Sequence, residues 1–154
     1  MIEPLLEVRD LDVSVLSPGG PLPILAGVSF EVPKRGSVAI VGESGSGKTM
    51  TALAILALLP EGATSRGSVR LEGRDLRDLS EKELCAVRGG SIGMVFQEPA
   101  SALDPVYSVG WQIIEALRLH RDVSRKEARR LAIEQLRKVG MPAPEERLDR
   151  HPHD

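Results

Sequence analysis

Aromatic residues and cysteine are scarce in this chain of 154 residues, and asparagine is absent. Aromatic side chains make up 3% of the sequence, too few to favour a base-stacking platform for single-stranded nucleic acid. The single cysteine, Cys85, excludes an internal disulfide, and the sequence has no cluster with metal-ligand spacing. This usage fits a reducing compartment such as the cytoplasm.

Long apolar runs are also missing. The longest run, residues 52–59, is far shorter than the roughly 20 residues that a membrane-spanning helix needs. The amino terminus, Met-Ile-Glu-Pro-Leu, has no basic region followed by an apolar stretch, so we expect no signal peptide. The sequence therefore predicts a chain that does not insert into a membrane by itself.

The bulk composition is that of an ordinary globular protein, with 42% hydrophobic and 27% charged residues. One domain is the default for this length. The formal net charge of −2 argues against general binding of nucleic acid. Residues 118–138 nevertheless carry eight basic against three acidic residues. We interpret this segment as a solvated helix face, with a nucleic-acid or lipid-headgroup patch as the alternative.

Residues 37–59 are the most informative stretch. The apolar, β-branched run 37–41 predicts a buried parallel strand, and the almost entirely apolar run 50–59 before Pro60 predicts a helix. Between them stand Gly42, Glu43, Ser44, Gly45, Ser46, Gly47, Lys48 and Thr49, which match the pattern G-x-x-x-x-G-K-[ST]. A strand, this loop and a helix are the structural context that the pattern requires.

The chemistry of a phosphate cradle explains these residue types. The glycines let the backbone turn tightly, so that successive N–H groups can point at a triphosphate. The positive end of the following helix acts on the same point. We expect Lys48 to reach the β- and γ-phosphates and the Thr49 hydroxyl to ligate Mg²⁺. The alternative is a glycine-rich turn with a solvated lysine, which explains neither the spacing nor the context.

Further strands are predicted on both sides of this loop. Alternating apolar residues indicate strands over 5–15 and 24–32, and the Pro/Gly-rich cluster at 17–21 indicates that they are antiparallel. Glycines bound a short strand over 67–73, and residues 92–96 form another buried-strand pattern. Antiparallel strands ahead of a phosphate-loop strand predict a mixed sheet.

Three serines predict helix starts. Ser80 and Ser124 begin capping boxes with Glu83 and Glu127, and Ser108 precedes an apolar helical face. The three helices are expected to reach Val87, His120 and the Gly140 stop, and residues 99–107 are expected to form a loop.

The phosphate loop alone leaves the class of nucleotide-binding protein open. GTPases need an N-K-x-D loop to bind the base, and a chain without asparagine has none. A small-molecule kinase remains an alternative, although the basic 118–138 segment lacks the glycine-flanked loops on which a lid would hinge.

Gln97 helps to choose among the classes of nucleotide-binding protein. An apolar strand pattern ends at this glutamine, 49 residues after Lys48. A glutamine at a strand's carboxyl end can coordinate Mg²⁺, orient a water or sense the γ-phosphate. The simpler interpretation, a polar strand cap, is the usual one for an isolated glutamine.

The motifs together resemble those of ABC-transporter ATPase subunits. GESGSGKT at 42–49 looks like their Walker A motif, and MVFQEPASALDP at 94–105 looks like their Q-loop. The flanking sequence is similar to the oligopeptide, dipeptide and nickel importer branch, including the duplicated ATPases of microcin-type peptide uptake. GVSFEV at 27–32, GRDL at 73–76 and RLDRHPHD at 147–154 fit that branch as well.

The resemblance implies an α/β fold: a P-loop core with an antiparallel β subdomain at residues 1–98, followed by the Q-loop and a helical segment at 99–154. It implies ATP and Mg²⁺ as cofactors, with Mg²⁺ held by Thr49 and Gln97, and Gln97 as the residue that orients water. It also implies a peripheral subunit on the cytoplasmic face of the inner membrane. Such subunits pair head to tail and bind permease subunits, here through the Q-loop and helices 108–139. The cargo would be peptides, nickel or similar solutes, and the sequence does not choose among them.

The chain also departs from the family. The 154 residues contain no L-S-G-G-Q signature, no apolar strand ending in Asp-Glu and no histidine in the position of the family's switch histidine. The stretch 13–16, where the family often places an aromatic residue against adenine, has none. We therefore expect the amino-terminal part of an ATPase domain, incomplete and with little hydrolysis of its own. The alternatives are a non-catalytic nucleotide-binding remnant and, less favoured, another P-loop enzyme.

Overall fold

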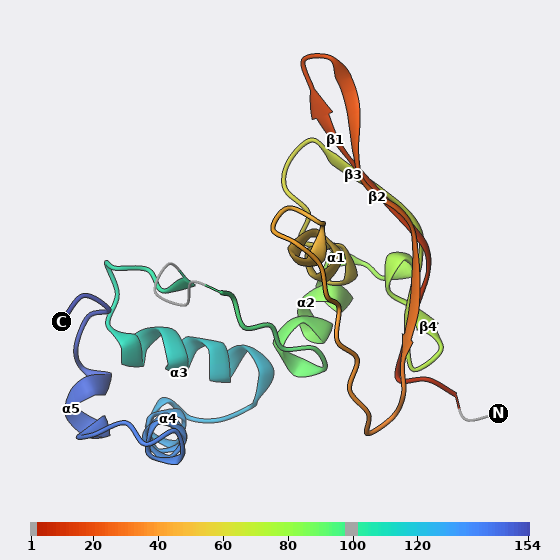
Figure 1. Ribbon diagram of the computed structural model, residues 1–154. Coiled ribbons are helices and arrows are strands. Elements are labelled where there is room, and N and C mark those ends of the chain that lie inside the picture. Colours follow the sequence, from red (N-terminus) through yellow and green to blue (C-terminus); the bar gives the residue numbers. More distant parts are fainter. Residues whose placement is uncertain (1–2, 98–101) are drawn as a thin grey trace. The chain divides into compact units, whose positions relative to one another are not determined.

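The computed structural model describes residues 3–97 and 102–154 (Figure 1). The chain forms two compact units, residues 1–88 and 89–154. Among the described residues, no helix is both long and apolar enough to cross a membrane.

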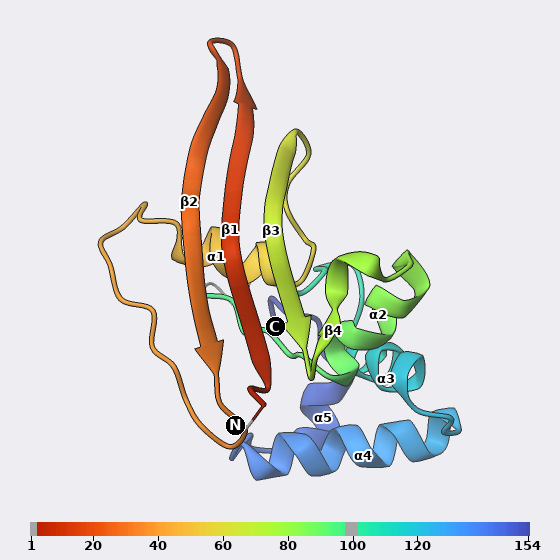
Figure 2. The same ribbon diagram turned by 90° about the vertical axis from the view of Figure 1, so that its right-hand side faces the viewer.

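The first unit is built on an antiparallel sheet with strand order β2-β1-β3-β4. The strands are β1 (Leu6–Ser17), β2 (Gly20–Val32), β3 (Ala63–Leu71) and the short β4 (Arg74–Asp75). β1 and β2 form a long hairpin whose tip extends beyond β3 (Figure 2). The antiparallel pair predicted from the sequence is confirmed, and both strands are longer than predicted.

A bulge in β1 allows three apolar side chains to face the same core. Val8, Leu11 and Val13 are all almost completely buried, although a regular strand would turn residues 8 and 11 to opposite faces. The register shifts between Val8 and Leu11, and Asp10 has φ 47°. Gly67 of β3 accommodates the bulge, because a Cβ there would lie 2.3 Å from the Asp10 carbonyl oxygen.

Helix α1 (Lys48–Ile55) contacts β1 and β2. The range 50–59 predicted from the apolar run is wrong at both ends. The helix stops because Ala57 takes a left-handed conformation, with φ 51°. The Leu58 N–H donates to the Leu53 carbonyl and the Ala57 N–H to the Ala54 carbonyl, the two bonds of a Schellman motif.

A 3₁₀ turn (Leu76–Asp78) and helix α2 (Glu81–Gly90) follow the sheet. The helix start predicted at Ser80 is confirmed: Glu83 accepts hydrogen bonds from the Ser80 N–H (2.9 Å) and hydroxyl (2.7 Å). Arg88 donates to the carbonyls of Leu56 and Ala57, both at 2.8 Å. α2 thereby satisfies carbonyl groups left at the end of α1.

The second unit is helical: α3 (Val109–His120), α4 (Arg125–Lys138) and the short α5 (Pro144–Leu148). The caps predicted at Ser108 and Ser124 are confirmed, since each hydroxyl accepts an N–H of its helix's first turn at 3.2 Å. The predicted loop before α3 is irregular over 102–107, and its first residues lie outside the described part of the chain. The core of the unit consists of Ile114, Ala128, Ala132 and Leu148.

Two strand predictions are wrong. Residues 37–41 form no strand, and residues 92–96 form none beyond an isolated bridge at Ile92. Val41 is 90% exposed and Val95 is 91% exposed. An apolar run becomes a buried strand only where neighbouring strands supply hydrogen bonds, and the described sheet, which is antiparallel rather than mixed, offers these segments no partner.

Leu148 should be the main packing residue of the helical unit. It is 0% exposed, and substitution Leu148→Ala should lower the free energy of unfolding by about 2–5 kcal/mol through lost burial and a cavity. Urea unfolding followed by the fluorescence of Trp111, which lies in the same unit, measures this loss. Leu119→Ala is the control, because Leu119 is 81% exposed. Equal effects of the two substitutions would contradict this account of the core.

The α2 cap predicts a specific pH dependence. Hydrogen bonds from Ser80, and then the Arg74 guanidinium, lower the pKa of Glu83 from 4.5 to about 2. Because the folded pKa is the lower one, this stabilisation is present above pH 4.5 and is lost as the pH falls from about 4.5 to about 2. Thermal unfolding of Glu83→Gln should therefore vary less over this window than that of the parent chain. Glu61→Gln, in an exposed loop, should behave like the parent, and an unchanged pH profile in Glu83→Gln would refute the cap.

Candidate phosphate-binding loop

Residues 42–49 form one continuous loop and helix start in the first unit. Residues 37–43, which form no regular secondary structure, lead into a turn at 44–47, and α1 begins at Lys48. Lys48 and Thr49 therefore occupy the first two helical positions, earlier than the sequence predicted. The turn is tightened by the Ser46 N–H, which donates to the Glu43 carbonyl at 3.2 Å.

Gly47 fixes where the loop lies against the sheet. Its φ is +91°, a conformation that disfavours other residues. A Cβ at this position would lie 2.4 Å from Cδ2 of Leu25, and Leu25 in β2 is itself only 6% exposed. The loop backbone is thus packed against the sheet at a point where only glycine fits.

The amino end of α1 is left open to an anion. The cap residue Gly47 has no side chain to accept a hydrogen bond, and the first turn contains no acidic residue. The partial positive charge of the helix end is therefore uncompensated by the protein. Thr51, which is 3% exposed, holds the turn in place: its hydroxyl and its backbone N–H both donate to the Gly47 carbonyl, at 3.0 and 2.8 Å.

Lys48 is held over the same loop. Its Nζ donates to the carbonyls of Gly42 (2.8 Å) and Glu43 (2.7 Å) and, more weakly, to the Ser46 hydroxyl (3.3 Å). An ammonium group has three donors. The two shorter hydrogen bonds hold the side chain in place. The third N–H makes only the longer bond to Ser46, so it can be donated to a phosphate oxygen instead. The positive charge is thus positioned beside the open helix end before any ligand binds.

The oxygen groups of the loop fit a phosphate-bound Mg²⁺ ion. Thr49 is exposed beside the helix end, and its hydroxyl is the hard oxygen ligand that Mg²⁺ prefers. No cluster of three His, Cys, Asp or Glu side chains that could hold a metal occurs in 3–97 or 102–154.

Gln97 lies in the second unit, is exposed, and follows residues 93–96, which form no regular secondary structure. Of the context predicted for residues 42–49, the helix that follows is present as α1, whereas residues 37–41 before them form no strand. The role of Gln97 stays a prediction.

Three contributing residues were missed by the sequence analysis. Leu25 blocks any side chain at position 47, Thr51 anchors the loop, and Arg88 caps the far end of α1. Thr51 carries one signal, since it is the only polar residue in the apolar run 50–59. The contacts of Leu25 and Arg88 span 22 and 32 residues of sequence and leave no local pattern.

Comparison with known proteins agrees with the motifs. A profile of the ABC transporter family matches residues 25–154. The chain is 47% identical over 152 residues to the oligopeptide transport ATP-binding protein OppD of Bacillus subtilis, covering 97% of this chain and 42% of that protein. It is 48% identical to OppD of Mycobacterium tuberculosis, covering 99% of this chain and 25% of that protein. The chain therefore spans less than half the length of these relatives.

Among solved structures, the chain resembles the dimeric ATP-binding cassette MJ0796 bound to ADP and Pi. The TM-score is 0.79 at 21% identity, covering 96% of this chain and 62% of that one. This likeness confirms the predicted fold class, a partial cassette with an antiparallel amino-terminal sheet followed by helices. Since the family profile covers most of the chain and includes the whole phosphate loop, the chain belongs to the ABC transporter family.

Proposed function

We propose that this chain is the phosphate-binding part of the ATP-binding subunit of a peptide-importing ABC transporter. The observation that carries the proposal is the arrangement at 42–49, where the Lys48 ammonium and the uncapped end of α1 converge on one exposed loop. Both groups attract the same ligand, a polyphosphate.

Each group has a separate task in binding ATP. The N–H groups of the turn and the first turn of α1 would donate to the phosphate oxygens. Lys48 would add a charge-assisted hydrogen bond to the β- and γ-phosphates, and its bonds to the Gly42 and Glu43 carbonyls reduce the entropy lost when it binds. Thr49 would hold Mg²⁺ together with the phosphate oxygens, and the ion would neutralise part of the phosphate charge.

Gln97 is proposed to complete the site by orienting water and binding Mg²⁺ in the assembled protein. Its carboxamide offers both a donor and an acceptor, which a water-orienting group needs. The support is its place at the end of the apolar segment 92–96 and the resemblance of its surroundings to the Q-loop.

Base recognition is proposed to be weak. Leu16 and Leu22, at the tip of the β1–β2 hairpin, are exposed, and no aromatic residue stands on residues 13–16. An aliphatic side chain contacts a base without the offset stacking that an aromatic ring provides. The phosphates should therefore contribute most of the binding free energy.

The partners follow from the relatives named above. Oligopeptide transport by OppD proteins supports peptides as the cargo, and the dimeric cassette supports pairing with a second ATPase subunit. Permease subunits would then hold the protein at the cytoplasmic face of the inner membrane. The exposed side chains of Val106, Tyr107 and Trp111 are candidates for that contact.

Hydrolysis by these 154 residues alone is proposed to be slow. They contain no apolar strand that ends in a carboxylate to polarise the attacking water, and no signature loop to complete a partner's site. Preorganised groups of this kind typically account for orders of magnitude in rate.

Substitution Lys48→Ala tests the proposal. Removing the ammonium should weaken Mg·ATP binding by at least about tenfold, because a charge-assisted hydrogen bond is lost. Isothermal titration of the 154-residue chain measures the dissociation constant. Lys34→Ala, in the exposed turn after β2, removes the same charge elsewhere and should bind like the parent.

Unchanged ATP affinity in Lys48→Ala would count against the phosphate loop. A phosphate-release assay on the parent chain should show a rate near the uncatalysed background, and brisk turnover would contradict the proposal of slow hydrolysis.

A further inference from the structure

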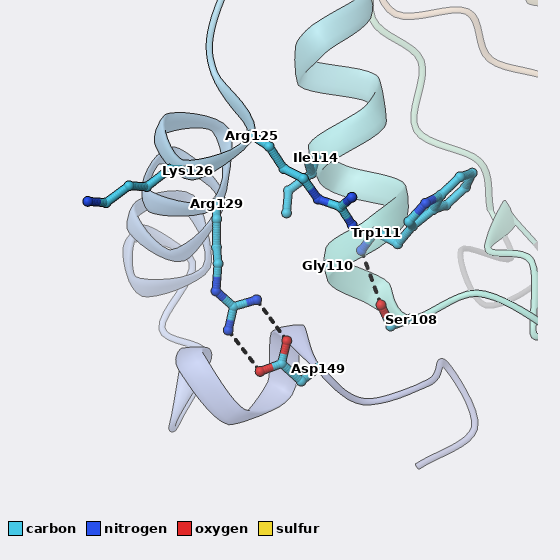
Figure 3. A pocket seen from close by; sticks show the side chains of 8 residues that line it. All are labelled: Ser108, Gly110, Trp111, Ile114, Arg125, Lys126, Arg129 and Asp149. Atoms are coloured by element: carbon cyan, nitrogen blue, oxygen red, sulfur yellow. Dashed lines mark hydrogen bonds and ion pairs between the residues drawn. The ribbon is translucent and has the colours of Figure 1, made fainter.

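The helical unit contains a hollow that the nucleotide site does not use. It has a volume of about 460 Å³ and is lined by residues from the first two turns of α3 and α4, by Ser108 and by Asp149 after α5 (Figure 3). Its apolar side is formed by Trp111 and Ile114, and its cationic side by Arg125 and Arg129. Every lining residue belongs to the second unit.

The basic residues of 118–138 are not equivalent. Among the described residues, acidic side chains pair with Arg118, Arg129, Arg130, Arg137 and Lys138. Arg121, Arg125 and Lys126 have no such partner in that part of the chain. Of these three, Arg125 extends toward the start of α3 and Trp111 in Figure 3, whereas Lys126 extends away from it. Arg125, which is exposed, is therefore the cation without an acidic partner among the described residues that points toward Trp111.

Arg129 also lines the hollow, but two of its hydrogen-bond donors are already used. Asp149 accepts both of its guanidinium hydrogen bonds, at 2.7 and 2.8 Å. The Arg129 guanidinium lowers the pKa of Asp149, so the pair stays ionised and nearly neutral in sum. The pair shows that this wall of the hollow can bind an oxyanion in the fork geometry that arginine also uses for phosphate.

The surroundings favour an anion over a neutral ligand. Arg125 stands in the first turn of α4, at the positive end of a 14-residue helix, where a cation is disfavoured unless an anion joins it. The Ser108 hydroxyl accepts a hydrogen bond from the backbone N–H of Trp111 and still has its own proton to donate. Trp111 stacks on Tyr107 with ring centroids 4.1 Å apart, which leaves a flat apolar wall beside the charged group.

We propose that this hollow is a phosphate-binding site, in which Arg125 is the principal ligand and the Arg129–Asp149 pair limits the affinity. The phosphate comes either from a lipid headgroup or from a free phosphate in solution. The site is independent of the nucleotide site, because no residue of 42–49 takes part.

Trp111 provides a direct reporter, since it is the only tryptophan in the chain and it lines the hollow. The titrations should use the whole chain with Lys48→Ala, so that phosphate bound at the nucleotide site does not contribute. The first probe is inorganic phosphate, and the second is vesicles of phosphatidylglycerol in phosphatidylcholine, with pure phosphatidylcholine vesicles as the blank. A fluorescence change with inorganic phosphate identifies the free source, and one with the anionic vesicles alone identifies the headgroup.

Three substitutions decide whether the hollow is the site. Arg125→Gln should weaken binding by about tenfold, the effect of one charge-assisted hydrogen bond. Arg121→Gln removes the same charge from the residue that follows α3, outside the hollow, and it should bind within about twofold of the parent. Asp149→Asn frees Arg129 and removes a negative charge, so it should tighten binding severalfold. A gain of affinity cannot result from misfolding.

The proposal is overturned by any of three results. These are no fluorescence change with either probe, equal losses in Arg125→Gln and Arg121→Gln, or no gain in Asp149→Asn. Because the titrations use Lys48→Ala, a negative result here leaves the nucleotide proposal standing, and failure of ATP binding leaves this one standing.

Discussion

The close contact between Gly47 and Leu25 is the constraint on which the nucleotide site depends. A left-handed glycine packed against a buried strand side chain fixes the direction in which α1 leaves the loop. That direction decides where the uncapped helix end points and where Lys48 can reach its two carbonyls. The position of the site's positive charges therefore depends on packing against the sheet, although no side chain of the sheet is proposed to bind the phosphates.

The helical unit depends on a similar close approach. Gly110 in the first turn of α3 leaves no room for a side chain, since a Cβ there would lie 2.5 Å from the Leu148 carbonyl oxygen. This lets the short helix α5 insert Leu148 completely between α3 and α4. The same packing brings Asp149 to Arg129 and so forms one wall of the proposed phosphate hollow.

Local features could be predicted from the sequence and nonlocal ones could not. The caps at Ser80, Ser108 and Ser124 depend on residues three positions apart, and all three were predicted. Helix α5 was missed because its five residues carry no periodic pattern. Residues 37–41 and 92–96 have the composition of strands, yet a strand exists only with a neighbour, and composition does not reveal whether one is present.

The measurement that tests the central claim most directly is the change in backbone amide chemical shifts when Mg·ATP is added to the whole chain. If the loop at 42–49 binds the phosphates through its N–H groups, the largest shifts should fall on residues 44–49 and should require the triphosphate rather than adenosine. Shifts centred elsewhere, or equal shifts with adenosine, would contradict the account.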